Sequence, residues 1–253
     1  MIQEILTLNI FAFIMVFARV GTALFIIPGF GGTKVNMRAR LSIALAIAFL
    51  VTPALASQLP PMPGAPLNLM LLMMGEVVAG AIIGTVPLIL IASVHTAGTI
   101  ISFVSAMANA LAFDPISQQQ SAIVAGFLSS IATLLLFVLE LHHLFIRAIL
   151  DSYTLFQPGV AIDFGDTLHL LARHVADSFK IGLQIATPFV VMSITYNLAL
   201  GILTRLAPQV PSFFVIMPVQ IGLGIVLLMI TVPGIMFVAL SNVERGITHF
   251  IVP

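Results

Sequence analysis

The sequence predicts an all-α integral membrane protein with six to seven hydrophobic helices. Of its 253 residues, 60% are apolar and 7% are charged, whereas about 25% of the residues in a typical soluble domain are charged. Nine acidic and nine basic side chains cannot cover the surface of a soluble protein of this size. The high apolar content also excludes a disordered chain, and the formal net charge of zero gives no reason to expect nucleic acid as a partner.

The positions of the charged residues locate the helices. A spanning helix needs about 20 mainly apolar residues, and long stretches of this chain lack Asp, Glu, Lys and Arg. They predict hydrophobic segments at 5–27 (interrupted by Arg19), 40–58, 69–94, 97–112, 121–140, 181–204 and 213–240. The number is six or seven because the uncharged stretch 77–113 is long for one span and short for two spans with a turn.

Proline and glycine account for the breaks between these segments, since both resist helix continuation. The first helix should end at Pro28-Gly-Phe-Gly-Gly32, and Pro60 to Pro66 cannot be helical. Gln157-Pro-Gly159 and Pro208-Gln-Val-Pro211 supply the later breaks. No internal repeat is visible, and we expect a single domain over residues 1–253.

Loop charge gives no clear orientation. The cations of the first loop favour a cytoplasmic position for that loop, but six spans would divide the remaining cations evenly. Lys34, Arg38, Arg40 and Arg205 would lie on one side, and Arg147, Arg173, Lys180 and Arg245 on the other. The chain has no Trp and two Tyr, so its aromatic belt is weak. Both features suggest that these helices do not all lie in lipid in the usual way.

Charged residues inside or beside apolar helices are candidates for a special role. Arg19, Glu76 and Glu140 have such positions, and a charge at the bilayer centre costs at least about 2.5–3.5 kcal/mol on insertion scales. Each could lie at an interface near a helix end, or it could form an interhelical ion pair or contact a water-filled path. Glu76 and Arg205 flank apolar helices, and we expect at least one of them to be neutralised across a helix interface.

Small residues predict close helix packing at two places. Gly80 and Gly84 form a GxxxG pattern, which lets membrane helices approach closely. The second place is a small, polar face, which is formed by Gly98, Ser102, Ser105, Asn109 and Ala112 at helical spacing. This face could pack against another helix or line a pore.

The segment Phe113 to Ser121 should interrupt the helices. Proline disfavours helix at the residue before it, so the preceding helix should end near Asp114, before Pro115. The segment could be an exposed loop, or an irregular loop at membrane depth, which is tolerated where protein or a water-filled cavity satisfies its backbone. Phe113 and Ile116 would supply apolar bulk, and the flexible Met107 could fill gaps.

Two further polar features fit ordinary helix surfaces. His142 and His143 are adjacent and therefore point in different directions on a helix, unlike the HExxH zinc arrangement. The segment 163–180 predicts an amphipathic helix that faces water or headgroups, or a partner. Its polar stripe contains Asp166, His169, Arg173, Asp177 and Lys180. The chain has no cysteine and no catalytic motif, so we expect no enzyme activity, metal or cofactor.

The order of the punctuating residues resembles the FliR family, the flagellar biosynthesis proteins of the type III export gate, whose virulence-secretion counterpart is the SctT family. The resemblance covers almost the whole chain, and the block Asn197 to Gln209 is its most specific part. It rests on Phe17-Ala-Arg19, Pro28-Gly-Phe30, Arg38, Glu76 to Gly80, Gly84, Ala97-Gly98, Asp114-Pro115, His142-His143, Ser152, Pro158-Gly159, Ala186-Thr-Pro188, Asn197 to Gly201, Arg205 to Gln209, Phe213-Phe214 and Pro218. The chain departs from many relatives at Val35-Asn36, where they have Val-Pro, and at Glu140-Leu141, where they have a glycine before the histidine pair.

The resemblance implies a non-enzymatic, all-helical subunit of a helical, pore-forming assembly in the bacterial inner membrane, at the flagellar basal body. One copy would join several copies of two other small gate subunits, and the assembly would export unfolded flagellar proteins. The family's plug loop corresponds to residues 106–122, which include Met107, Phe113, Asp114, Pro115 and Ile116. Arg19, Glu76, Gly80, Gly84, Asn197, Gly201 and Arg205 would serve helix packing or a buried charge.

Three alternatives remain at this point. The chain could be the equivalent subunit of a virulence type III system, a stand-alone secondary transporter, or an intramembrane enzyme. The absence of a clear repeat and the small number of intramembrane ionisable groups disfavour a transporter. The absence of a paired catalytic set disfavours an enzyme.

Overall fold

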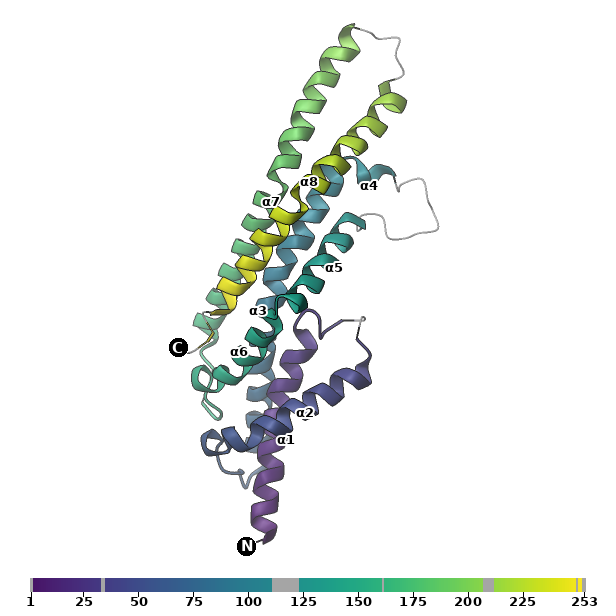
Figure 1. Cartoon of the computed structure of the whole chain (residues 1–253). Coiled ribbons are helices and arrows are strands. Elements are labelled where there is room, and N and C mark those ends of the chain that lie inside the picture. The colour runs from purple at the N-terminus through teal and green to yellow at the C-terminus, as the bar shows by residue number, and fades with distance from the viewer. Residues whose placement is uncertain are drawn as a thin grey trace. The chain divides into compact units, whose positions relative to one another are not determined.

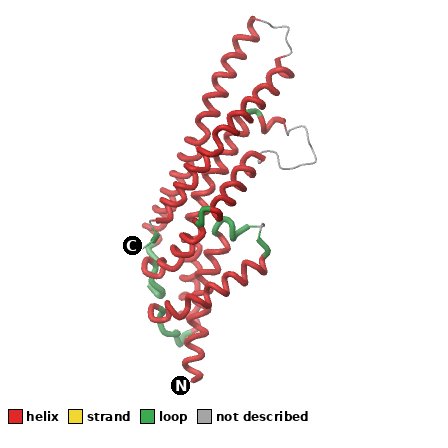
Figure 2. Tube along the Cα trace, in the orientation of Figure 1, coloured by secondary structure: helices red, strands yellow, loops and turns green. Residues whose placement is uncertain are grey.

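The computed structural model describes residues 2–32, 35–110, 123–160, 162–206, 212–248 and 250–251. Within these ranges the chain is helical apart from turns, and it contains no strand (Figure 1, Figure 2). The elements are α1 (Ile2–Ile26), α2 (Met37–Leu55), the 3₁₀ turn η1 (Ala56–Gln58), α3 (Pro66–Val104), α4 (Met107–Ala110), α5 (Ile123–Val138), α6 (Leu141–Leu155), α7 (Phe164–Leu206) and α8 (Ser212–Thr248). The predicted all-α fold class is confirmed.

Several of these helices are long and apolar enough to cross a membrane. Four such helices occur among the described residues, at Met37–Gln58, Pro66–Val104, Phe164–Leu206 and Met217–Thr248. The number becomes five if the bent pair α5 and α6 counts as one span. The protein is therefore a multi-pass membrane protein, as its composition predicts.

Two predicted helix boundaries are absent. The segments 69–94 and 97–112 belong largely to one 39-residue helix, α3. The segments 163–180, apart from Asp163, and 181–204 belong to the 43-residue helix α7. Neither boundary contains a Pro-Gly pair: Gly98 is an isolated glycine inside α3, and Lys180 is a good helix former. A change in polarity along the sequence therefore did not correspond to a break in the backbone.

The break between α5 and α6 occurs where the sequence contains neither proline nor glycine. The predicted segment 121–140 ends at a 74° bend between α5 and α6. Glu140 lies in the bend with φ of 60° and ψ of 16°, the left-handed conformation that commonly ends helices. The amide of Glu140 donates to the carbonyl of Phe137 at 3.1 Å, which closes the last turn of α5.

The chain divides into two compact units whose boundaries fall inside long helices. Unit 1 contains residues 1–90, 134–175 and 243–253, and unit 2 contains residues 91–133 and 176–242. We describe each unit by itself. The predicted single domain over 1–253 stays a prediction.

In unit 1, small residues let the helices approach closely. α2 packs on α1 through Ala44 and Ala48, whose side chains are fully buried. The turn after α1 contains Gly29, which has φ of 93°, and a Cβ at this position would clash with the ring of Phe137. Only glycine satisfies both conditions, which explains the predicted break at Pro28 to Gly32.

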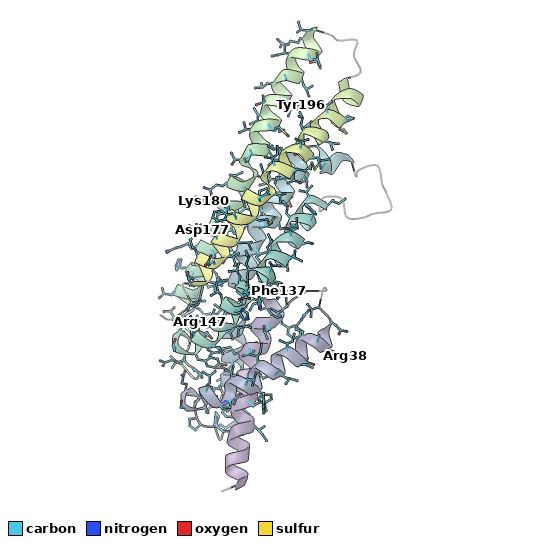
Figure 3. The ribbon with its side chains drawn as sticks, in the orientation of Figure 1. Arg38, Phe137, Arg147, Asp177, Lys180 and Tyr196 are labelled. Atoms are coloured by element: carbon cyan, nitrogen blue, oxygen red, sulfur yellow. The ribbon has the colours of Figure 1, made fainter. Side chains whose placement is uncertain are left out.

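The same turn is held by a basic residue. Arg40 of α2 is buried, its guanidinium donates to the carbonyls of Gly32 and Val35, and it lies over the Phe25 ring at 4.7 Å. Arg38, in contrast, is exposed at the start of α2 (Figure 3). Arg40 therefore closes a turn, and the loop-charge argument should not count it as a cation facing water.

In unit 2, the small, polar face predicted along 98–112 is used for close packing. A Cβ added to Gly98 of α3 would lie 2.5 Å from the Cα of Ala125 in α5. Ser102 and Ser105, further along the same face, are buried. The side chain of Asn109 and all of Ala112 lie outside the described residues.

Candidate functional site

A buried ion pair in unit 1 joins α1 to α3. Nε of Arg19 donates to Oε2 of Glu76 at 2.8 Å, and Nη2 of Arg19 donates to Oε1 at 3.0 Å. Both residues are 1% exposed. Paired Arg–carboxylate bonds of this kind are stronger and more directional than a single contact. The structure thus brings together two of the charged residues that the sequence singled out.

The guanidinium of Arg19 also ties the end of α6 to this pair. Nη1 donates to the backbone oxygen of Ser152 at 3.1 Å and to its hydroxyl at 3.3 Å, and Nη2 donates to the carbonyl of Phe156 at 2.8 Å. The carbonyl of Ser152 also accepts from the amide of Phe156, the residue that follows α6, at 2.8 Å. Arg19 adds a second donor to Ser152 and a donor to the carbonyl of Phe156, and thereby caps the end of α6. Its five N–H groups are all directed at acceptors, as a buried guanidinium requires.

The ring of Tyr153 covers the other side of the guanidinium. The Cζ atom of Arg19 lies 3.9 Å from the ring centroid, which is a cation–π distance. Tyr153 is fully buried, and its hydroxyl has no hydrogen-bond partner among the described residues. The ring, rather than the hydroxyl, therefore accounts for the contact between Tyr153 and Arg19.

Gly80 and Gly84 allow α3 to come this close to α1. A Cβ on Gly80 would overlap the carbonyl oxygen of Arg19, and a Cβ on Gly84 would lie 2.8 Å from the carbonyl oxygen of Ala23. Both obstacles are backbone atoms, so neither could move aside cheaply. The GxxxG pattern brings the backbones together just where Glu76 meets Arg19.

A mainly apolar cavity of about 790 Å³ lies beside the ion pair in unit 1. Its walls include Arg19, Glu76, Pro61, Leu71 and Phe156. The donors of Arg19 are all engaged with protein acceptors, so the guanidinium offers no free donor to a ligand there. The arrangement holds three helices together.

The other predicted residues of unit 2 do not form a site. Asn197, Gly201 and Arg205 are exposed on α7, and the amide of Asn197 donates to the carbonyl of Ser193 on its own helix at 2.8 Å. Of the two charges that flank apolar helices, Glu76 pairs with Arg19 within unit 1, whereas Arg205 is exposed. Met107 lies at the start of α4, whereas Phe113, Asp114, Pro115 and Ile116 lie outside the described residues.

The two histidines and the predicted amphipathic stretch bring no metal ligands together. The ring of His142 lies 5.2 Å from that of Phe137, and the exposed His143 lies 3.9 Å from Glu140. Asp177 and Lys180 are exposed on α7, as Figure 3 shows. Within the described ranges, no group of three or more His, Cys, Asp or Glu side chains could hold a metal ion.

Sequence reasoning missed several residues that matter in these contacts. It did not identify Tyr153 or Phe156 as partners of Arg19, because one contributes a ring face and the other a backbone carbonyl. It also missed Gln220 of α8, whose Nε2 donates to the carbonyl of Val104 at 2.9 Å. The available signal for Gln220 was its position as a polar residue inside the predicted hydrophobic segment 213–240.

Comparison with known proteins supports one family over almost the whole chain. The family model described as bacterial export proteins, family 1, matches residues 10–246. A flagellar biosynthetic protein FliR of Caulobacter vibrioides is 38% identical over 88% of this chain and 89% of its own length. Those of Bacillus subtilis and Escherichia coli are 29% and 27% identical, over 92% and 90% of this chain and 90% and 85% of their own lengths. The resemblance drawn from the sequence motifs is thus confirmed, and the chain belongs to the bacterial export proteins, family 1, within the FliR family.

Proposed function

We propose that this protein is a structural, pore-forming subunit of the flagellar type III protein export gate, needed for export of unfolded flagellar subunits and for flagellum assembly. The observation that carries the proposal is the similarity to FliR proteins over nearly the whole length of both chains. The membrane-spanning helices of the described residues support it, because an export gate must lie in a membrane.

The proposed place of the protein is the bacterial inner membrane, in a hetero-oligomer with the other membrane subunits of the gate and in one copy. Exposed apolar side chains support an assembly, among them Leu198 and Ile202 on α7, which are 66% and 63% exposed. Asn197 and Arg205 are exposed on the same stretch, and polar groups in a lipid-facing position are costly. Protein partners on this face would remove that cost.

Co-purification tests the proposed assembly. A tagged chain expressed with the other gate subunits of its own organism should be recovered with them as one complex in detergent. The same chain expressed alone should aggregate or degrade, since its uncovered apolar faces would be exposed. A stable, monodisperse monomer that moves a solute across liposome membranes would contradict the proposal and favour a stand-alone transporter.

The proposal includes no enzymatic step and no cofactor. In this proposal the energy for export comes from other components, and this chain contributes part of the channel wall.

The family resemblance further suggests a plug formed by Met107, Phe113, Asp114, Pro115 and Ile116, most of which lie outside the described residues. If these residues fill the channel, deleting 113–118 should leave complex recovery unchanged and raise the ion conductance of cells that contain the whole gate. Normal recovery with background conductance would mean that the segment is only a connector.

A further inference from the structure

The end of α3 in unit 2 is held by a helix that is distant in sequence. Gln220 of α8 donates from Nε2 to the carbonyl oxygen of Val104 at 2.9 Å, across 116 positions of sequence. Val104 is the last residue of α3, and carbonyls at helix ends lack an intrahelical donor. Gln220 therefore provides a hydrogen bond that the helix itself cannot make.

One turn further along, α8 leaves room for the residue that follows α3. A Cβ added to Gly224 would lie 2.7 Å from Cβ and 2.9 Å from Oγ of Ser105. Ser105 is fully buried, and its hydroxyl finds no hydrogen-bond partner in the part of the chain that the structure describes. Because Gly224 has no side chain, Ser105 fits directly against the backbone of α8.

The backbone changes direction at this contact. Ala106 has φ of 56°, in the left-handed region, and α4 begins at the next residue, Met107. The left-handed conformation costs a non-glycine residue roughly 1–2 kcal/mol, so it persists only where the surroundings impose it. The terminal methyl of Met107 also lies 3.1 Å from the position of a Cβ on Gly224, so α8 contacts both sides of the bend.

We propose that Gln220 and Gly224 form a latch on α8, which holds the end of α3 and sets the direction in which the chain enters α4. The two are positioning residues for the export channel. This proposal rests on the proposed function, since the family resemblance places residues 106–122 in the export path. It goes beyond that function because it assigns to Gln220 and Gly224, which are distant in sequence, the positioning of the first residues of the segment 106–122.

Glycine substitutions give the first test, in a flagellated host that lacks its own FliR and is rescued by this chain. Gly224→Ala would push on Ser105 and should lower export of flagellar subunits about tenfold while complex recovery stays normal, because a side chain and not a whole interface is displaced. Gly222→Ala is the matched control, because no atom lies within 4 Å of a Cβ there, and it should export normally.

A compensating change keeps this test specific. Ser105→Gly removes Cβ and Oγ, the two atoms that would lie closest to the new methyl, and leaves the end of the flexible Met107 side chain, at 3.1 Å. The double variant Ser105→Gly/Gly224→Ala should therefore recover most of the lost export. Two results would contradict the latch. One is equal export by the Gly224→Ala and Gly222→Ala variants. The other is a loss of complex recovery in Gly224→Ala as large as the loss of export, with neither loss restored by adding Ser105→Gly. If the unaltered chain fails to rescue the host although the complete gate is recovered from its membrane, the proposed function fails instead, and the two failures are distinguishable.

The hydrogen bond of Gln220 has its own test, which does not depend on export. The chain has no cysteine, so Ala108→Cys can carry a single nitroxide label on α4 in a purified complex whose partner subunits have had any cysteines replaced. Gln220→Met keeps the length of the side chain but removes the donor, and it should increase the mobility of the label. Gln184→Met, at an exposed position of α7, should leave the spectrum unchanged. Identical spectra for the two methionine variants would overturn the role of Gln220.

Discussion

Arg19 of α1 and Glu76 of α3 are joined by two hydrogen bonds of 2.8 and 3.0 Å, and both side chains are almost completely buried. Removing charges from water is costly, and the pair is tolerated because the remaining donors of Arg19 also find acceptors on α6. The contact therefore fixes three helices of unit 1 at one point.

Breaking this pair from one side should be more damaging than removing it entirely. Glu76→Leu leaves a buried cation, and Arg19→Met leaves a buried carboxylate; each should destabilise the protein by about 3–5 kcal/mol. The double variant should be less damaging than either single variant. Recovery of the complex after a graded heat treatment measures this order.

The control for these variants is Glu244→Ala, at an exposed position of α8, which should behave like the unaltered protein. Arg19→Lys should also be impaired, because an ammonium group cannot donate to the carboxylate and to the carbonyls of Ser152 and Phe156, at the end of α6, in the same fork geometry. Equal recovery of all these variants would mean that the pair contributes nothing to the assembly.

Gly80 should be intolerant of even one added methyl group. In Gly80→Ala the new Cβ would meet the backbone oxygen of Arg19, so α1 and α3 would separate and strain the ion pair. We expect the free energy of unfolding to fall by about 1–3 kcal/mol, as is typical of an overpacked core. Gly75→Ala on the same helix meets no atom within 4 Å and should raise stability slightly, since alanine favours helix. A Gly80→Ala complex as stable as Gly75→Ala would contradict the close approach.

The bend between α5 and α6 can be improved by design. Glu140 has φ of 60°, which costs a non-glycine residue roughly 1–2 kcal/mol, whereas glycine loses about 0.5–1 kcal/mol through its greater freedom in the unfolded chain. Glu140→Gly should thus stabilise the folded protein by about 0.5–1 kcal/mol, which is the difference between these two costs. The exposed pair with His143, at 3.9 Å, offsets little of this gain.

Thermal unfolding of the purified complex tests the Glu140 prediction. Glu140→Val should lower the midpoint, because a β-branched residue is a poor fit to positive φ. If glycine at position 140 destabilises more than valine does, the bend does not have the left-handed geometry described above.

The sequence alone predicted the membrane class and most helix positions, because charge-free stretches of about 20 residues are typical of membrane spans and rare in soluble domains. It failed where backbone geometry and polarity do not coincide. The α7 helix continues without a break where its exposed residues change from polar to apolar. The bend at Glu140 contains no proline or glycine from which it could be predicted. A pattern of residue types does not contain this information.

For the site, the sequence identified Arg19 and Glu76 separately as unusual charges and left their pairing open. Their separation of 57 positions gives no periodicity from which a contact could be inferred. The caps on α6 use backbone carbonyls, which every residue has, so no residue type marks them. For the same reason nothing in the sequence marked the carbonyl of Val104 as the partner of Gln220, although Gln220 itself is a polar residue within an apolar segment.

Restoration of export is the decisive measurement for a role in the flagellar gate. The chain should be expressed in a Caulobacter vibrioides strain that lacks its own FliR, together with the gate subunits of its own organism, and the flagellar subunits released into the medium should be quantified. We expect the unaltered chain to restore release and Glu76→Leu to leave it absent. Absence of release with the unaltered chain, in cells where the complete gate is recovered from the membrane, would rule out a role in flagellar export.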